Sequence, residues 1–228
     1  MTDVFVIPLI SDTDFEALSS SLNRLVPYEI REKAGRFARI RDSQRSLVGE
    51  VAMRFLLGQA TGNDYAGRSF PSGEKGKPAP WGIDGIFLNM SHSGDWVAVA
   101  LSPLPVGVDV EMMRKVPEGV AYRFFSPAEK KWLQQARDED EKAHIFFTLW
   151  TLKESFLKAT GKGLTKSLSS FTVVQQRNGG FRLTDDPEAE GYFLKNLPFE
   201  QGYKLSVCSR EPEFCNEVKI LKITDLIP

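Results

Sequence analysis

The chain has 228 residues, 42% of them hydrophobic, which suits one compact soluble unit with a real core and is short for two independent domains. A formal net charge of −1 at pH 7 gives no overall attraction for nucleic acid or an anionic membrane, so any polyanion site must be local. No apolar run approaches membrane-spanning length, and the first residues lack the layout of a secretion signal, so we expect a cytoplasmic protein with reduced cysteines.

The first third of the chain is predicted to be helical and locally basic. Pro27 can open a helix, and Leu47, Val51 and Phe55 belong to an apolar set that recurs at helical spacing. Basic residues such as Lys33 and Arg45 accompany this set, and taken singly they are typical of a solvated helix face. Residues 73–80 then form a loop that presents Lys77, because Pro78 cannot continue a helix.

The middle of the chain is predicted to be β-rich. Residues 85–89, 95–101 and 106–111 are expected to form consecutive antiparallel strands separated by turns. His92 lies between hydroxyl residues in the first of these turns. That placement suits either a structural hydrogen bond or close approach to a phosphate.

The strand at residues 106–111 carries two carboxylates in an alternating pattern. Its valines fall on one face, and Asp109 and Glu111 fall on the other. The pattern fits a solvated edge strand or a face that holds a cation.

Two helices are expected next. Residues 126–129 have the form of a capping box with a proline at the first helical position. A helix over residues 142–160 is apolar almost all round, with Gly161 as its stop, yet Trp150, Glu154 and Lys158 lie four residues apart along it. A carboxylate in a buried helix is costly unless it is paired or bound to a cation, although Lys158 can also serve as a plain helical partner of Glu154.

A faint internal repeat divides the chain. Residues 55–62 and 154–161 both end a helix on Ala-Thr-Gly, which suggests two related α+β halves, residues 1–104 and 105–228, with a site between them. Phe55 and Gln59 stand where the second copy has Glu154 and Lys158. Only one site is therefore expected to be chemically competent.

In order and spacing, the motifs from about Arg31 to Gly163 resemble the Sfp-type phosphopantetheinyl transferases. The resemblance rests on Lys77-Pro78, residues 89–93, residues 106–111, residues 124–126 with Glu129, and residues 150–159. It implies an α+β pseudo-dimer of two halves, each a small antiparallel sheet packed on helices. It also implies transfer of the phosphopantetheine arm of coenzyme A to a serine of an acyl or peptidyl carrier protein of fatty-acid, polyketide or nonribosomal peptide synthesis.

The resemblance also assigns roles to residues. Asp109, Glu111 and Glu154 would bind Mg²⁺, and Lys158 would neutralise the pyrophosphate. Glu154, or less readily Glu129, would take the proton of the serine hydroxyl. Asp109, Glu154 and Lys158 form the expected catalytic set. Coenzyme A would be bound by this lysine together with Lys33, Arg45, Ser46, Lys77, Pro78, Ser91 and His92.

Two other classes of function remain open from the sequence. A magnesium-dependent phosphodiesterase or nuclease also needs clustered carboxylates and a lysine, but the net charge speaks against nucleic acid. A non-catalytic coenzyme A-binding module would not need Glu154 and Lys158. We expect a monomer whose partners are coenzyme A and the carrier, with neither nucleic acid nor membrane.

Overall fold

The computed structural model describes residues 1–70, 81–83, 85–116, 119–161 and 166–227. The elements of the first half are β1 Asp3–Pro8, α1 Asp12–Arg24, α2 Tyr28–Gly35, α3 Ile40–Thr61, β2 Trp81–Ile83, β3 Ile86–Ser93 and β4 Trp96–Ser102. Those of the second are β5 Val106–Met112, α4 Val120–Phe124, α5 Pro127–Gln134, α6 Glu139–Ala159, the short helix η3 Leu168–Ser170, β6 Thr172–Gln175, β7 Phe181–Thr184, the short helix η4 Pro187–Ala189, β8 Phe193–Leu197 and β9 Tyr203–Ser209. The chain ends with β10 Lys219–Ile220 and the short helix η5 Ile223–Leu226.

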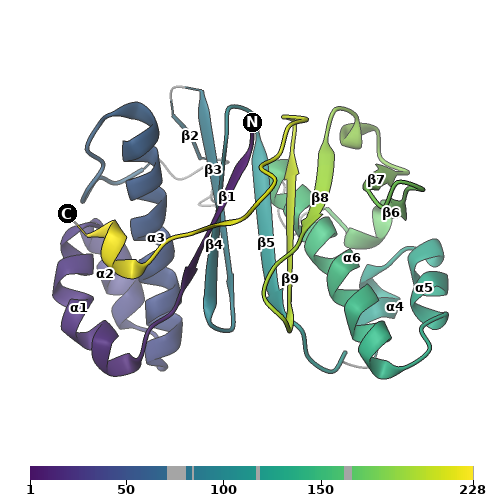
Figure 1. Ribbon diagram of the computed structural model, residues 1–228, viewed down its shortest axis with the longest axis horizontal. Coiled ribbons are helices and arrows are strands. Elements are labelled where there is room, and N and C mark those ends of the chain that lie inside the picture. Colours follow the sequence, from purple (N-terminus) through teal and green to yellow (C-terminus); the bar gives the residue numbers. More distant parts are fainter. Residues whose placement is uncertain (71–80, 84, 117–118, 162–165, 228) are drawn as a thin grey trace.

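Two five-stranded sheets lie side by side at the centre of the molecule, with helices on the outside of each (Figure 1). Their strand orders are β10-β1-β4-β3-β2 and β5-β9-β8-β7-β6. Helices α1 to α3 cover the first sheet, and α4 to α6 cover the second. The α+β architecture of two similar halves is as the sequence predicted.

One expectation about the strands is wrong. β3 and β4 pair antiparallel, but β5 does not continue their sheet and pairs with β9 instead. The reason is burial: Val106, Val108 and Val110 are fully buried in a core that also contains Val4 and Val6 of β1. β5 therefore faces the first sheet across an apolar layer, which a strand in that same sheet could not do.

Local signals set the helix boundaries. The Ser126 hydroxyl and the Glu129 carboxylate form the capping box that begins α5, and α6 runs over residues 139–159 where a helix over 142–160 was predicted. Gly62 follows the last residue of α3, and Gly161 lies two residues after the end of α6. Their φ values of 72° and 69° are in the left-handed region, which glycine adopts without a Cβ penalty. Each copy of the Ala-Thr-Gly repeat thus ends a long helix.

The segment after β9 returns to the first half. Thr2 donates its N–H to Glu213 O and accepts from Cys215 N, and β10 then pairs parallel with β1. Ile223 and Leu226 are buried in the core of the first half. Cys208 and Cys215 are free and buried, as expected, and none of the described helices has the length and hydropathy to cross a bilayer. The division at residues 104 and 105 stays a prediction.

Candidate functional site

The close approach of β5 to α6 begins at Gly107. A Cβ placed there would lie 2.0 Å from the carbonyl oxygen of Ser155 and 2.4 Å from the amide nitrogen of Ala159. Only a residue without a side chain lets the strand run this close to the helix. Because side chains alternate along a strand, Asp109 and Glu111 then face the same helix.

Gly107→Ala should therefore push β5 away from α6. We expect overpacking to cost about 1–3 kcal/mol of stability and to lower any activity that depends on Asp109, which lies two residues away. Thermal unfolding and an activity assay measure both effects. Gly35→Ala is the control, because nothing lies within 4 Å of a Cβ at that position. An unchanged Tm in Gly107→Ala would contradict the argument.

Asp109 is paired through one oxygen only. Its Oδ1 accepts from Lys158 Nζ at 2.8 Å and from Ser91 Oγ at 2.9 Å, and the same ammonium donates to Val108 O at 3.0 Å. The residue is 5% exposed, and its Oδ2 is buried with no hydrogen-bond partner among the described residues. A buried carboxylate oxygen without a hydrogen-bond partner can accept a cation or a donor from a bound ligand.

Glu111 follows on the same face of β5. Its Oε2 accepts from Ser93 Oγ at 2.7 Å. Burial is the largest cause that raises the pKa of Glu111, the Ser93 hydrogen bond opposes it, and the negative charge of Asp109 adds to the rise.

Glu154 is the third carboxylate of the cluster. Burial raises its pKa most, Asp109 and then Glu111 raise it further, and Lys158 opposes the rise. Three carboxylates thus lie close enough for their charges to act on one another. Lys158 opposes the rise in pKa at both Glu111 and Glu154, and Arg114 opposes it at Glu111.

The donor set fits a hard divalent cation. Carboxylate oxygens from two elements, one of them unpartnered, are the ligands that Mg²⁺ prefers, and mutual repulsion between them favours a cation. In the part of the chain that the structure describes, no three His, Cys, Asp or Glu side chains are grouped so that they could hold a metal ion as they stand. In this arrangement Asp109 Oδ1 accepts from Lys158 and Glu111 Oε2 accepts from Ser93, and a bound cation would compete with both contacts.

Positive groups flank the carboxylates on the side of the first half. His92 is exposed, yet partial desolvation of its ring lowers its pKa most, and the charges of Arg45 and then Lys158 lower it further. Arg45 holds the β3–β4 turn by donating to Gly94 O at 2.5 Å and also pairs with Asp42 at 2.5 Å. The sequence placed His92 in a turn, but residues 86–93 form β3 and the turn begins at Gly94.

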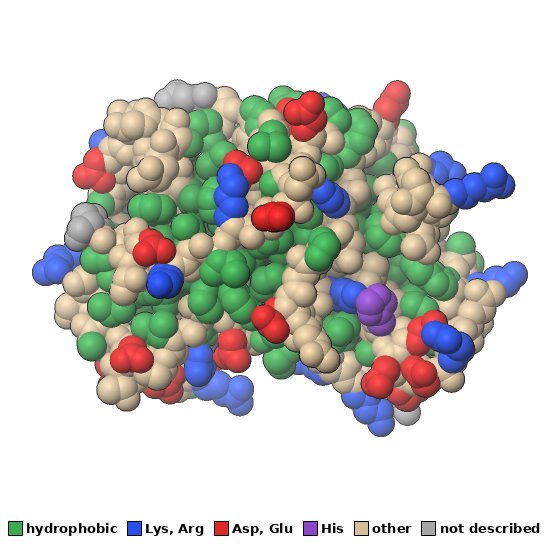
Figure 2. All heavy atoms as spheres, viewed as in Figure 1, with side chains coloured by type: hydrophobic (Ala, Val, Ile, Leu, Met, Phe, Trp, Pro, Cys, Tyr) green, Lys and Arg blue, Asp and Glu red, His purple; other side chains and the backbone are tan. Residues whose placement is uncertain are grey.

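The remaining predicted coenzyme A contacts are more dispersed. Ser46 is buried in α3, whereas Lys33 is exposed in α2 and lines a hollow of about 650 Å³ with Tyr28 and Phe37 among its walls. Lys77 and Pro78 lie outside the described residues. Side chains of both charge signs are intermixed over the face drawn in Figure 2.

Two residues of the expected constellation take structural positions. The ring of Trp150 packs against Phe124 and Phe146, with centroids at 5.6 and 5.8 Å, so its indole belongs to an aromatic cluster. Glu129 is 1% exposed; it accepts from Ser126 N at 2.8 Å, from Val173 N at 2.7 Å, and lies 2.8 Å from Lys153 Nζ. These contacts leave Glu129 no proton-transfer role, so Glu154 is the better candidate base.

Sequence reasoning missed the partners that hold the charged residues. Lys153, next to Glu154, is 0% exposed, and its ammonium donates to Leu168 O at 2.9 Å and Phe171 O at 2.6 Å. Ser93 and Asn89 contact β5 from the other sheet. A lysine at position 153 of an apolar helix already indicated that this side chain needs a buried partner. Nothing in the local sequence identifies that partner.

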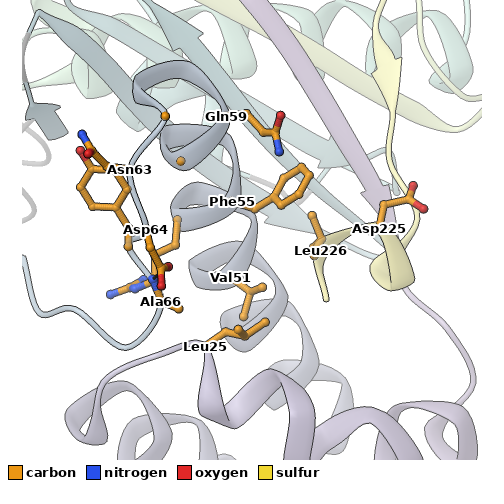
Figure 3. A pocket seen from close by; sticks show the side chains of 13 residues that line it. Leu25, Val51, Phe55, Gln59, Asn63, Asp64, Ala66, Asp225 and Leu226 are labelled. Carbon is orange, nitrogen blue, oxygen red and sulfur yellow. Dashed lines mark hydrogen bonds between the residues drawn. The ribbon is translucent and has the colours of Figure 1, made fainter. Parts of the chain in front are cut away.

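The first copy of the repeat lines a different hollow. It measures about 590 Å³, and Phe55 and Gln59 of α3 point toward Asp225 and Leu226 of η5 (Figure 3). An aromatic ring and an amide thus stand where α6 has a carboxylate and an ammonium. None of Asp109, Glu111, Glu154 and Lys158 lines this hollow.

Comparisons with known proteins indicate the same family over nearly the whole chain. Residues 13–104 match the family model described as 4'-phosphopantetheinyl transferase, N-terminal, and residues 105–208 match that of the 4'-phosphopantetheinyl transferase superfamily. A 4'-phosphopantetheinyl transferase of Bacillus subtilis is 37% identical over 89% of this chain and 90% of the relative. The 4'-phosphopantetheinyl transferase Sfp of Bacillus subtilis strain 168 is 34% identical over 87% of this chain and 88% of its own length. The 4'-phosphopantetheinyl transferase psf-1 of Bacillus pumilus is 32% identical over 98% of this chain and 97% of its own.

Proposed function

This chain belongs to the 4'-phosphopantetheinyl transferase superfamily, and on that premise we propose that it performs its reaction at the carboxylate cluster of β5 and α6, beside β3. The reaction transfers the phosphopantetheine moiety of coenzyme A to a serine of a carrier protein. One observation supports this location: the charges of Asp109, Glu111 and Lys158 all act on Glu154, Asp109 pairs with Lys158, and Asp109 Oδ2 is buried without a partner among the described residues.

Asp109, Glu111 and Glu154 would hold Mg²⁺. Their support is the chemistry of the donor set, which consists of three carboxylates. Burial raises the pKa of Glu111 and Glu154 most and neighbouring carboxylates raise it further, with Lys158 and, at Glu111, Arg114 opposing the rise. When bound, the ion supplies charge neutralisation at the pyrophosphate of coenzyme A.

The side chains of the protein supply positioning and proton transfer. Lys158 neutralises phosphate oxygens, and Arg45 and His92 are close enough to influence one another electrostatically on the same side. Glu154 accepts the hydroxyl proton of the carrier serine. At the same time the serine oxygen forms a bond to the phosphorus that bears the pantetheine arm. The bond from that phosphorus to the adenosine bisphosphate breaks, and this portion leaves.

The other coenzyme A contacts stay proposals from the resemblance: Lys33, Ser46, Lys77, Pro78 and Ser91. Of these, Ser91 lies beside the carboxylates, with its hydroxyl 2.9 Å from Asp109 Oδ1. A monomer is proposed as the working form, since residues of both halves of one chain already meet at Asp109 and Glu111. Size-exclusion chromatography with light scattering tests that point.

Asp109→Ala should abolish carrier modification while leaving the fold intact. The substitution removes one cation ligand and the partner of Lys158. The assay is the mass gain of a panel of apo carriers from fatty-acid, polyketide and peptide synthesis, incubated with coenzyme A and Mg²⁺. Circular dichroism checks folding, and turnover like that of the wild type would contradict the cation assignment.

The same assay separates the rival functions. A hydrolase would cleave coenzyme A without any carrier present. A binding module would leave every carrier unmodified while still binding coenzyme A in calorimetry. Mass gain on a carrier, dependent on added Mg²⁺ and lost with EDTA, supports the transferase with its cation.

A further inference from the structure

Three side chains of β3 reach across the boundary between the two sheets to β5. Asn89 Oδ1 accepts from Val108 N at 3.0 Å, and Ser91 Oγ donates to Asp109 Oδ1 at 2.9 Å. Ser93 Oγ donates to Glu111 Oε2 at 2.7 Å and accepts from Met112 N at 3.1 Å.

The arrangement follows from strand geometry. Residues 89, 91 and 93 alternate, so their side chains leave the same face of β3. β5 pairs with β9 along one edge, and β3 belongs to the other sheet. Polar side chains therefore take the place of a neighbouring strand along part of the outer edge of β5.

Ser93 has a double role within this set. A serine hydroxyl has one hydrogen to donate, and here that hydrogen goes to the carboxylate of Glu111. The oxygen accepts the Met112 N–H at the same time, so the backbone of β5 fixes where the hydroxyl lies. The rotamer of Glu111 is thus tied to the main chain of its own strand through a residue of the other half.

The contacts leave each carboxylate with one oxygen held and one free. Asp109 Oδ1 is held by Ser91 and Lys158, and Oδ2 has no partner among the described residues. Glu111 Oε2 accepts from Ser93. Among the residues that the structure describes, none donates a hydrogen bond to Glu111 Oε1. Two carboxylates therefore present one oxygen apiece.

We propose that Ser93 is a positioning residue, which sets the carboxylate of Glu111 for the divalent cation by joining it to the backbone of β5. The inference rests on the proposed function, because it concerns the same cation. Groups that hydrogen-bond a ligand carboxylate orient it, and their loss typically weakens metal affinity about 10–100-fold.

The experiment measures cation binding directly. Mn²⁺ is titrated into the full-length protein with saturating coenzyme A and no carrier, and free Mn²⁺ is followed by electron paramagnetic resonance. A titration of coenzyme A alone supplies the background. We expect Ser93→Ala to raise the Kd for Mn²⁺ about 10–100-fold, and Ser93→Thr, which keeps the hydroxyl, to stay near the wild-type value. In the transfer assay, the Mg²⁺ concentration that gives half the maximal rate should rise by a similar factor.

Ser102→Ala is the matched control. Ser102 also has a buried hydroxyl that joins the halves, 2.9 Å from Thr2 Oγ1 and 3.1 Å from Ser209 Oγ, but it lies at the far end of the strands from Ser93. The control should lose some thermal stability and keep its Mn²⁺ affinity.

Equal Mn²⁺ affinities in wild type and Ser93→Ala overturn this inference alone. An equal loss in Ser93→Ala and Ser102→Ala also overturns it, because general loosening of the halves would then explain both. Wild-type protein that modifies a carrier yet binds no Mn²⁺ would contradict the cation assignment of the proposed function, and the inference with it.

Discussion

Glu154→Gln should inactivate the enzyme and make the metal-free protein more stable. The substitution removes the candidate base, and loss of a general base typically lowers kcat about 10²–10⁴-fold. It also removes a half-buried negative charge that Asp109 and Glu111 repel, as the raised pKa of Glu154 indicates. Each kcal/mol gained would raise Tm by about 2–4 °C for a chain of this size.

The pH dependence of stability follows in sign from the same shifts. In the folded protein the pKa values of Glu111 and Glu154 are raised, first by burial, so the folded state holds these protons to higher pH than the unfolded chain. Their stabilising contribution is fully present below the unfolded pKa and is lost as pH rises through the folded pKa. Metal-free wild type should therefore lose more stability over this window than Glu154→Gln does.

Thermal unfolding in EDTA, from below the unfolded pKa of the two carboxyl groups to above their folded pKa, measures the stability. Mass gain on a carrier measures the activity. Adding Mg²⁺ with coenzyme A should raise the Tm of the wild type more than that of the variant, because the variant lacks one ligand. A variant that is less stable than wild type in EDTA at neutral pH would contradict the view that the carboxylates repel one another.

Lys153→Met should be among the most destabilising single substitutions in the chain. The ammonium pairs with Glu129 Oε1 at 2.8 Å and donates to Leu168 O and Phe171 O, and both side chains of the pair are 0% exposed. Removing one partner of a buried pair typically costs about 3–5 kcal/mol, since the other charge stays buried and unpaired. Here two backbone carbonyls also lose their donor.

Urea unfolding gives the free energy of unfolding for this comparison. Lys142→Met is the control on the same helix, because Lys142 pairs with Glu139 at 3.1 Å in an exposed position and should change stability by less than about 1 kcal/mol. A loss below about 1 kcal/mol in Lys153→Met would show that other contacts hold α5, α6 and β6 together.

The cluster of Asp109, Glu111, Glu154 and Lys158 lies in the second half, and the repeat places no equivalent charged pair at Phe55 and Gln59 of the first half. Phe55 and Gln59 lie in the last turns of α3 as Glu154 and Lys158 do in α6, but they point toward Asp225 and Leu226 of η5 and line a separate hollow. The segment after β9 covers this part of the first half, with Ile223 and Leu226 buried in its core. The two halves share an architecture and differ in chemistry.

The sequence by itself determined what depends on neighbours along the chain. The alternation in residues 106–111 put the valines and the carboxylates on opposite faces of β5, and the spacing of four along α6 put Glu154 near Lys158, because strand and helix periods are local properties. The capping box at Ser126 and the glycine after each long helix set boundaries for the same reason.

The tertiary structure alone decided which sheet each strand joins and what holds the charged groups. An apolar face does not specify its partner, so pattern could not separate β5 from β4. The contacts of Ser93 with Glu111 and of Lys153 with Phe171 join residues 18 apart in sequence and in separate elements. Such pairs form only once the whole chain has packed, and their geometry follows from close packing of the halves, which no local period encodes.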